Sequence, residues 1–208
     1  MTFMDKTLKE FQILLASEEP TPGGGTASAV ALGQAAALTC MVSKLTLSSE
    51  KWQTGWEFSR QCLAVAEPLL EQAGVLAQQD SDAFDKVMKS YRLPKSSDDE
   101  IQHRREQILI STLAATLVPL ETATLAVQLL EVLPQLALIG NSNAVTDVGV
   151  AGLLASAAAK GALFNVSINV GGLSEQHQEE INPQVEELTE KARVLSREIM
   201  DNVRISLN

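Results

Sequence analysis

Apolar side chains recur along most of this chain at the spacing of a helix. Near the C-terminus they form a heptad stripe with alternating steps of four and three residues, at Ile181, Val185, Leu188, Ala192, Leu195 and Ile199. A shorter amphipathic pattern opens the chain, at Leu8, Phe11, Leu14 and Leu15. Such spacing predicts amphipathic helices, and period-two alternation is hinted at only over residues 166–170. The predicted fold class is therefore all-α.

Glycine and proline clusters divide this pattern into long segments, because neither residue continues a helix readily. They lie at residues 20–25, 93–97, 140–145 and 171–172. Capping residues predict where the next helices begin. The predicted starts are Thr26, Ser48 or Ser49, the Ser97–Glu100 capping box, Thr146, and Asn182 followed by Pro183. No repeat or linker divides the chain, so we expect a single-domain bundle over residues 1–208.

Two features predict how these helices pack. Prolines lie inside apolar segments: Pro68 predicts a kink, Pro119 an interruption of its helix, and Pro134 lies near the end of a predicted helix. Small residues recur every four positions, which lets helix backbones approach closely. They are Gly25, Ala29, Gly33 and Ala37 in one helix, and Ala151, Ala155 and Ala159 in another. We expect these two helices at the centre of the bundle or at a dimer interface.

Charge excludes several classes of partner. Sixteen Lys and Arg face 26 Asp and Glu, a net charge of −10, so nucleic acid and anionic membranes are not expected partners. Residues 20–43 carry no charge but are rich in Ala, Gly and Thr, which predicts a buried helix of a soluble protein rather than a membrane span. We expect no signal peptide and a cytoplasmic protein.

Metal and nucleophile chemistry lacks a sequence motif here. The two cysteines, Cys40 and Cys62, form no CxxC pair, and His103 and His177 stand far apart. We therefore predict buried reduced thiols and no metal site.

Four polar clusters interrupt the apolar pattern. A proline- and glycine-rich loop at 20–26 opens a helix, whose free N–H groups can bind an anion. Asp80, Asp82 and Asp85 cannot share one helix face, so some must point inward, where burial would raise the pKa of a carboxyl group. The other clusters are 140–147 and the amide pair Asn165 and Asn169. Each also has a structural interpretation, as a turn, a cap or a solvated face.

Taken in order, these clusters resemble the cyclodeaminase/cyclohydrolase family. The matching segments span residues 20 to 170: Pro20–Ala29 to PTPGGGSxSA, Met41–Thr46 to MVxxLT, Asp80–Phe84 to DxxxF, Leu93–Lys95 to LPK, Val118–Leu120 to VPL, Gly140–Asp147 to GN…SD and Asn165–Asn169 to NVxIN. The family includes the C-terminal domain of formiminotransferase-cyclodeaminase and stand-alone bacterial proteins. The resemblance departs after Leu47, where relatives carry Gly and basic residues and this chain has Ser48, Ser49 and Glu50.

The resemblance implies an all-helical, oligomeric folate enzyme, expected here as a homodimer. The implied reaction closes 5-formiminotetrahydrofolate to 5,10-methenyltetrahydrofolate with release of ammonia, with no cofactor beyond the tetrahydrofolate substrate. We assign Asp80 as acid/base, with Asp147 as the alternative catalytic group or a pterin contact. The predicted substrate-binding residues are Pro22, Gly23, Gly24, Gly25, Lys95, Asn141, Asn165 and Asn169. Gly23–Gly25 or Lys95 would hold the glutamate tail.

The sequence leaves two other functions open. The first is 5,10-methenyltetrahydrofolate cyclohydrolase, which gives 10-formyltetrahydrofolate on the same site. The second is a non-catalytic helical binding protein, which would have mutually satisfied polar groups and no open cleft beside Asp80.

Overall fold

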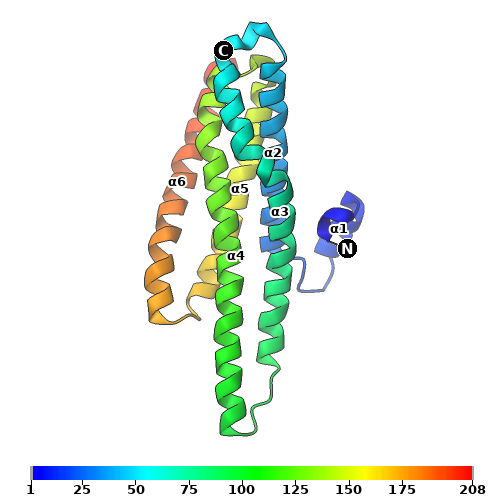
Figure 1. Ribbon diagram of the computed structural model, residues 1–208, viewed down its shortest axis with the longest axis vertical. Helices are drawn as coiled ribbons and strands as arrows, with labels where there is room; N and C mark the ends of the chain where they lie inside the picture. The colour runs from blue at the N-terminus through cyan, green and yellow to red at the C-terminus, as the bar shows by residue number, and fades with distance from the viewer. Residues whose placement is uncertain (1, 208) are drawn as a thin grey trace.

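The computed structural model describes residues 2–207, which form one elongated helical bundle without a strand (Figure 1). The α-helices are α1 (Leu8–Leu15), α2 (Gly24–Leu47), α3 (Trp56–Tyr91), α4 (Asp98–Ile139), α5 (Val145–Val170) and α6 (Glu175–Leu207). Three short 3-10 turns are η1 (Phe3–Asp5), η2 (Glu50–Gly55) and η3 (Ser142–Ala144). The predicted all-α class is confirmed.

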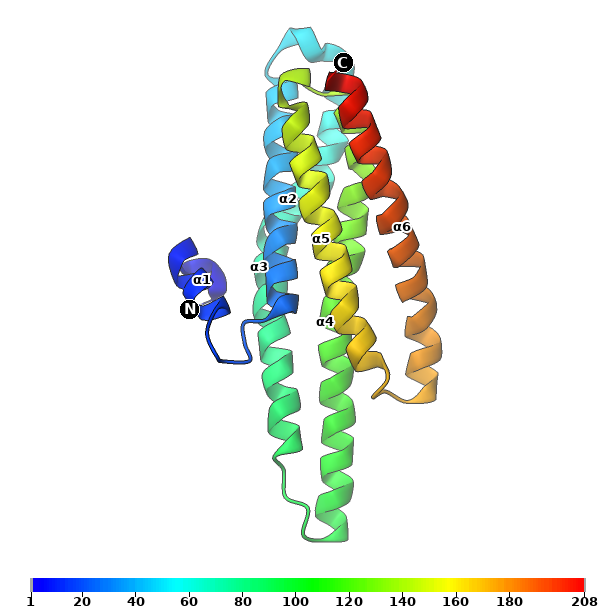
Figure 2. The same ribbon diagram turned by 180° about the vertical axis from the view of Figure 1, so that it is seen from behind.

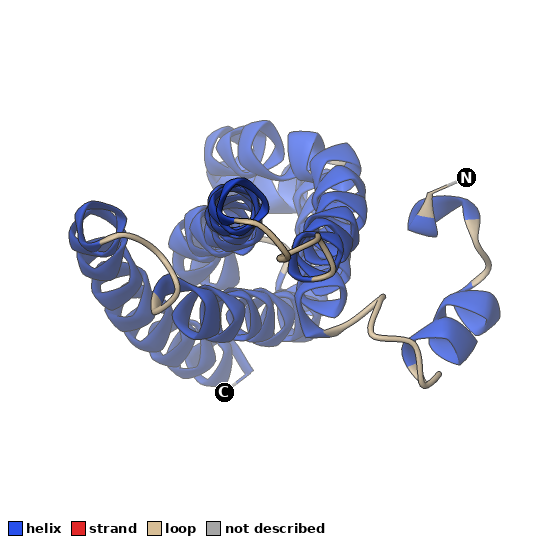
Figure 3. Ribbon diagram, turned by 90° about the horizontal axis from the view of Figure 1, so that it is seen from below, coloured by secondary structure: helices blue, strands red, loops and turns tan. Residues whose placement is uncertain are grey.

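The five long helices run side by side, and α1 lies apart from them (Figure 3). Helix α2 packs on α3 and α5, and α4 packs on α3, α5 and α6. The hairpin of α3 and α4 projects beyond the start of α2 and the end of α5 (Figure 1). The core consists largely of Ala and Leu, and the heptad stripe of α6 turns Ile181, Leu188 and Ile199 into it.

Several predicted helix boundaries hold, and others are wrong. The Ser97–Glu100 capping box is formed as predicted. Thr146 is not a cap, because η3 already brings the chain into the helix at Val145. Helix α6 begins at Glu175 and passes through Asn182 and Pro183. In its first turn the His177 N–H donates to Ser174 Oγ at 3.4 Å, so Ser174 caps this helix. The prediction followed the Asn-Pro pattern at residues 182–183 instead.

Residues 48–55 also differ from the prediction. Ser49 stands at the N-cap position of the 3-10 turn η2 without a capping side-chain hydrogen bond, and α3 begins only at Trp56. The Trp56 indole N–H donates to the Thr46 carbonyl at 3.0 Å, which fixes the chain reversal between α2 and α3. The prolines at 68, 119 and 134 lie inside continuous helices. Figure 1 shows α3 changing direction in its upper half.

The small residues allow close helix contacts, as predicted. The ridge of α2 faces α3, where a Cβ at Gly33 would lie 3.2 Å from the Ala73 Cβ. On α5, Ala151, Ala155 and Ala159 are fully buried. Gly152 of α5 lies so close to Ile199 of α6 that a Cβ there would be 2.8 Å from Ile199 Cγ2.

Three segments are long and apolar enough to cross a membrane by length and composition alone: Gly24–Leu47, Asp98–Ile139 and Ser142–Val170. In the bundle, 44%, 39% and 56% of their most apolar windows is buried. More than half of the first two windows, and less than half of the third, is therefore not buried within this chain.

Gly152 and Gly149 provide a matched test of the α5–α6 contact. A Cβ at Gly149 would make an ordinary contact, 3.5 Å from Val203 Cγ2. We expect Gly149→Ala to raise the free energy of unfolding by about 0.5 kcal/mol, because Ala favours the helix. Gly152→Ala should lower it by roughly 1 kcal/mol, because Ile199 must move. Urea denaturation measures both values, and an equal gain from both would contradict the close contact.

Candidate active site at the start of helix α2

Helix α2 begins in a glycine-rich turn that provides no capping side chain. Gly23 is its N-cap, and Gly24 and Gly25 are its first two residues. The N–H groups of the first helical turn have no partner within the helix and carry its partial positive charge. This end of the helix therefore favours an anion.

The anion that occupies this position is the chain's own Asp80, which comes from α3. Thr26 Oγ1 donates to Asp80 Oδ2 at 3.0 Å, and the backbone of Thr26 bonds the same carboxylate. Gly25 lies directly beneath it, and a Cβ at this position would collide with the carboxylate, 2.6 Å from its Cγ. Glycine is thus required where α2 and Asp80 meet.

Burial controls the acidity of Asp80. It raises the pKa of the carboxyl group above its ordinary value, because the charged form is poorly solvated, while the hydrogen bonds from Thr26 lower the pKa in part. The other two acids of this cluster behave differently. Asp82 is exposed and accepts from Gln78, and Asp85 accepts a long hydrogen bond from Thr21 at 3.4 Å. One of the three carboxylates points inward, as predicted.

A pocket of about 210 Å³ opens beside Asp80. It is lined by Pro20, Thr21, Gly23, Gly24, Gly25, Asp80, Phe84, Ala115, Asn165, Ile168 and Asn169. The loop, α2, α3, α4 and α5 all contribute to this wall. Pro22 is buried between lining residues and follows a cis peptide bond. The pocket is thus lined by one acid with a raised pKa, by two amide side chains and by the aromatic ring of Phe84.

The two amides are held in fixed orientations. Asn165 Nδ2 donates to the Gly161 carbonyl and Asn169 Nδ2 to the Ala115 carbonyl, each at 2.9 Å. A primary amide also carries an acceptor oxygen and a second N–H. Each side chain is therefore anchored through one N–H and keeps further groups with which to bind a ligand.

Three predicted site residues lie elsewhere in the chain. Asn141 and Asp147 are near the start of α5, whereas Asn165 and Asn169 are near its end. Eighteen residues of helix place Asp147 roughly 27 Å from Asn165. Lys95 is exposed in the loop at the tip of the α3–α4 hairpin, more than ~16 Å along α3 from Asp80. One chain alone therefore gathers the glycine loop, Asp80, Asn165 and Asn169.

Sequence reasoning missed several residues of this site. Phe84 lines the pocket because it follows Asp80 by four residues and shares its helix face. Thr26 contacts Asp80 although its position suggested only a helix start. Within residues 2–207, no group of three His, Cys, Asp or Glu side chains is placed to hold a metal ion.

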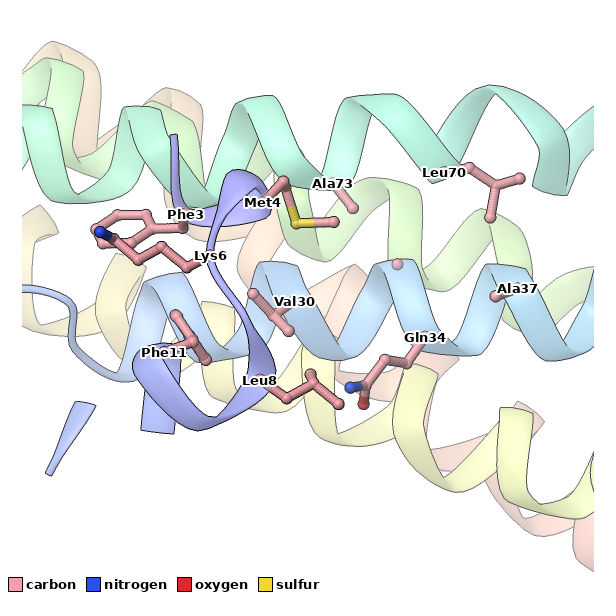
Figure 4. A pocket seen from close by; sticks show the side chains of 11 residues that line it. Phe3, Met4, Lys6, Leu8, Phe11, Val30, Gln34, Ala37, Leu70 and Ala73 are labelled. Atoms are coloured by element: carbon pink, nitrogen blue, oxygen red, sulfur yellow. The ribbon is translucent and has the colours of Figure 1, made fainter. Parts of the chain in front are cut away.

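A second cavity, of about 350 Å³, lies between the N-terminal segment and α2 and α3 (Figure 4). Its lining is mostly apolar, with Phe3, Met4, Leu8 and Phe11 from the N-terminal segment. Lys6 and Gln34 are its polar side chains, and no carboxylate lines it. It lacks the acid/base group that the Asp80 pocket contains.

Comparisons with known proteins agree on one family. The formiminotransferase-cyclodeaminase family model matches residues 7–201. A methenyltetrahydrofolate cyclohydrolase of Methylorubrum extorquens is 34% identical, over 98% of this chain and 99% of the relative. A formimidoyltransferase-cyclodeaminase of Gallus gallus is 29% identical over 90% of this chain, which spans only 35% of that relative.

A solved structure shows the same architecture. The formiminotetrahydrofolate cyclodeaminase of Thermotoga maritima superposes with a TM-score of 0.86 at 26% identity, covering 99% of both chains. The agreement of sequence and fold over nearly the full length shows that this chain belongs to the formiminotransferase-cyclodeaminase family.

Proposed function

We propose that this chain is a folate enzyme that forms or opens the one-carbon bridge between N5 and N10 of tetrahydrofolate, with Asp80 as its acid/base. The observation that carries this proposal is the buried Asp80 carboxylate, with its raised pKa, beside an open pocket flanked by two anchored amides. The pocket favours catalysis over a purely structural role, because an assembly protein would have no use for an open cavity beside a buried acid.

The first candidate reaction is the cyclisation of 5-formiminotetrahydrofolate. N10 attacks the carbon of the protonated formimino group, whose C=N bond becomes a single bond to an NH2 group, and the Asp80 carboxylate accepts the proton that N10 loses. The same group then gives that proton to the amine. The carbon–nitrogen bond breaks, its electron pair leaves with ammonia, and 5,10-methenyltetrahydrofolate remains. A carboxyl group with a raised pKa suits both transfers near neutral pH.

The second candidate, cyclohydrolase, is favoured by the similarity to the Methylorubrum extorquens protein over the full length of both chains. Water attacks the methenyl carbon while Asp80 takes one proton from the water, which leaves a hydroxyl group on that carbon. Asp80 gives this proton to N5 as the bond from the carbon to N5 breaks, and the electron pair of that bond stays on N5. The hydroxyl group loses its own proton to solvent and becomes the carbonyl of 10-formyltetrahydrofolate. Both reactions use the same pocket and pass through a tetrahedral carbon.

The remaining pocket residues bind and orient the substrate in this proposal. Asn165 and Asn169 offer hydrogen-bonding groups to the pterin, and Gly24 and Gly25 let it approach the start of α2. Tetrahydrofolate supplies the reacting atoms, and no further cofactor enters either reaction. Lys95 stays a candidate for the anionic glutamate tail.

We also infer that the working form is a homodimer, because one face of the bundle carries a long exposed apolar stripe. On α5 it comprises Val150 (46% exposed), Leu153 (56%), Phe164 (75%) and Ile168 (80%). Helix α2 lies beside it and adds Met41 and Leu45 (Figure 2). Helical spacing puts these residues on one side of each helix. A second copy would cover this surface with the same surface, by two-fold symmetry.

An antiparallel arrangement of the two copies explains why Asn141 and Asp147 are far from Asp80. The stripe on α5 is centred near Ala159, within about one helical turn of Ser156, the midpoint between Asp147 and Asn165. Pairing about this point brings the Asn141–Asp147 end of one subunit beside Asn165 of its partner. We propose that each site combines Asp80 of one subunit with Asp147 of the other.

We propose a cytoplasmic location, with the apolar stripe covered by a second copy rather than by lipid. Charged side chains border the stripe, Asp147 and Lys160 on α5 and Lys44 on α2, where Lys44 pairs with Glu67 at 3.0 Å. Such groups are costly inside a hydrocarbon layer.

The central assay follows the near-ultraviolet absorbance of the methenyl compound. Purified protein should form this band from 5-formiminotetrahydrofolate, or remove it from 5,10-methenyltetrahydrofolate, and the two substrates distinguish the two candidate reactions. Activity on neither substrate would overturn the proposed function.

Asp80→Asn should lower the activity and raise the stability of the folded protein. We expect a loss of about 10²–10⁴-fold in kcat/KM, because the amide cannot transfer protons. Its Tm at pH 7 should rise by a few degrees, because the folded protein no longer buries a charge. A raised pKa destabilises the fold only when Asp80 is ionised, so this gain should shrink as the pH falls toward about 4. Asp82→Asn on the exposed side is the control, and a matching rise there would contradict the assignment.

The apolar stripe predicts the oligomeric state. Leu153→Asp should convert a dimer into a monomer in light scattering and remove activity, because a charge would be buried at the interface. Val194→Asp, on the exposed side of α6, is a matched change that should leave the dimer intact. A monomeric wild type, or one that needs detergent to leave the membrane fraction, would contradict the homodimer.

Mixing two inactive variants tests the shared site. Asp80→Asn and Asp147→Asn should each be nearly inactive alone. A heterodimer carries one site with both residues intact, so mixing equal amounts should restore about a quarter of wild-type activity after subunit exchange. If the site lay within one chain, every site would lack one carboxylate and no activity would return.

A further inference from the structure

Two buried hydroxyl groups form a hydrogen-bonded chain behind Asp80. Thr26 Oγ1 lies 3.0 Å from Asp80 Oδ2 and 2.9 Å from Ser81 Oγ. Thr26 is fully buried and Ser81 is 3% exposed. The chain joins the first turn of α2 to the middle of α3.

The direction of each hydrogen bond follows from the number of protons. A carboxylate only accepts, so Thr26 must give its single hydroxyl proton to Asp80. Thr26 then has only lone pairs left for Ser81, and Ser81 must be the donor in their bond. The order is Ser81 to Thr26 to Asp80, and each bond in such a chain polarises the next.

We propose that Thr26, supported by Ser81, is a positioning residue that holds Asp80 Oδ2 and leaves Oδ1 as the oxygen that exchanges a proton with the substrate. This inference rests on the proposed function, in which Asp80 first accepts a proton and then gives it up. Thr26 acts through Asp80 and does not itself touch the reacting atoms.

The chain supports both forms of Asp80 during one turnover. When Asp80 accepts the proton from N10, the N10–H bond breaks and an O–H bond forms at Oδ1. Thr26 keeps donating to Oδ2, which is then the carbonyl oxygen of the acid. When the acid protonates the departing amine, that O–H bond breaks and the carboxylate returns to the same hydrogen bonds. The side chain need not rotate between the two steps.

Besides burial, the Thr26 hydroxyl and then the Thr26 backbone are the influences on the pKa of Asp80. Gly25 and Thr26 from α2 contact Asp80, and the pocket beside it is lined by Ala115 from α4 and the amides Asn165 and Asn169 from α5. None of these side chains titrates near neutral pH. The nearest acids on α3 itself are Asp82, which is exposed, and Asp85, which is held by Thr21. Loss of the Thr26 hydroxyl should therefore be visible in the titration of Asp80.

Thr26→Val removes the hydroxyl group and keeps the shape of the side chain. We expect the acidic limb of the pH profile of kcat/KM to move up by roughly one pH unit, because a hydrogen bond to the charged form is lost. Ser81→Ala should move it in the same direction by less, since Thr26 still donates. Thr26→Ser, which keeps the hydroxyl group, should leave the acidic limb at its wild-type position. Thr39→Val, a buried change on α2 where the hydroxyl bonds only the Ala35 carbonyl, should leave the limb unchanged.

Carboxyl-carbon NMR of protein with ¹³C-labelled Asp gives a second measurement that needs no turnover. Asp80→Asn identifies the Asp80 signal, and its titration should shift upward in Thr26→Val and return in Thr26→Ser. An upward NMR shift in a protein inactive on both folates would support the hydroxyl chain and overturn the proposed function alone. Two results would overturn this inference. In the first, folded Thr26→Val shows no change in the acidic limb of the pH profile or in the NMR titration of Asp80. In the second, Thr39→Val moves both by as much as Thr26→Val does.

Discussion

The Asp80 carboxylate packs directly against the first turn of α2, and the architecture around the pocket depends on this contact. The helix start offers free N–H groups and a positive partial charge, and Asp80 takes the place of the missing capping side chain. The contact is possible only because Gly25 has no Cβ. The same contact fixes α2 against α3, so the packing of the bundle and the acidity of its candidate catalytic group have one origin.

Much of the fold and part of the site could be predicted from the sequence. Periodicity identified the helices, and the inward Asp80, the glycine turn and the amide pair Asn165 and Asn169 meet at one pocket. These residues were identifiable because a polar group in an apolar helix, or a glycine cluster at its start, departs from the local pattern. Short-range signals of this kind are read directly from the chain.

What the sequence could not provide were distances and partners. Asn141 and Asp147 belong to the same resemblance as Asn165 but lie at the other end of α5, because a long helix separates its two ends rigidly. Thr26 was missed because a hydroxyl at a helix start has an ordinary capping explanation. The start of α6 was predicted at Asn182 and Pro183, but the helix begins at Glu175 and contains Pro183. Tertiary packing can override the low helix propensity of a proline.

Two features reduce the stability of the isolated chain, and each marks a function in this account. A buried acid with a raised pKa is a cost that a purely structural helix would avoid. An exposed stripe from Val150 to Ile168 is a cost that a monomer would avoid. The stripe ends at the pocket, since Ile168 also lines it, so the proposed subunit contact and the proposed site form one continuous surface.

The most direct test of the central claim is a crystal structure of the protein with 5-formyltetrahydrofolate, a stable analogue that carries a one-carbon group on N5. The account predicts that N10 and this group lie within hydrogen-bonding distance, about 3 Å, of the Asp80 carboxylate. It also predicts that Asp147 of a second, antiparallel subunit borders the pterin. A folate bound elsewhere, for instance in the cavity beneath the N-terminal segment, with its N5–N10 edge away from Asp80, would contradict it.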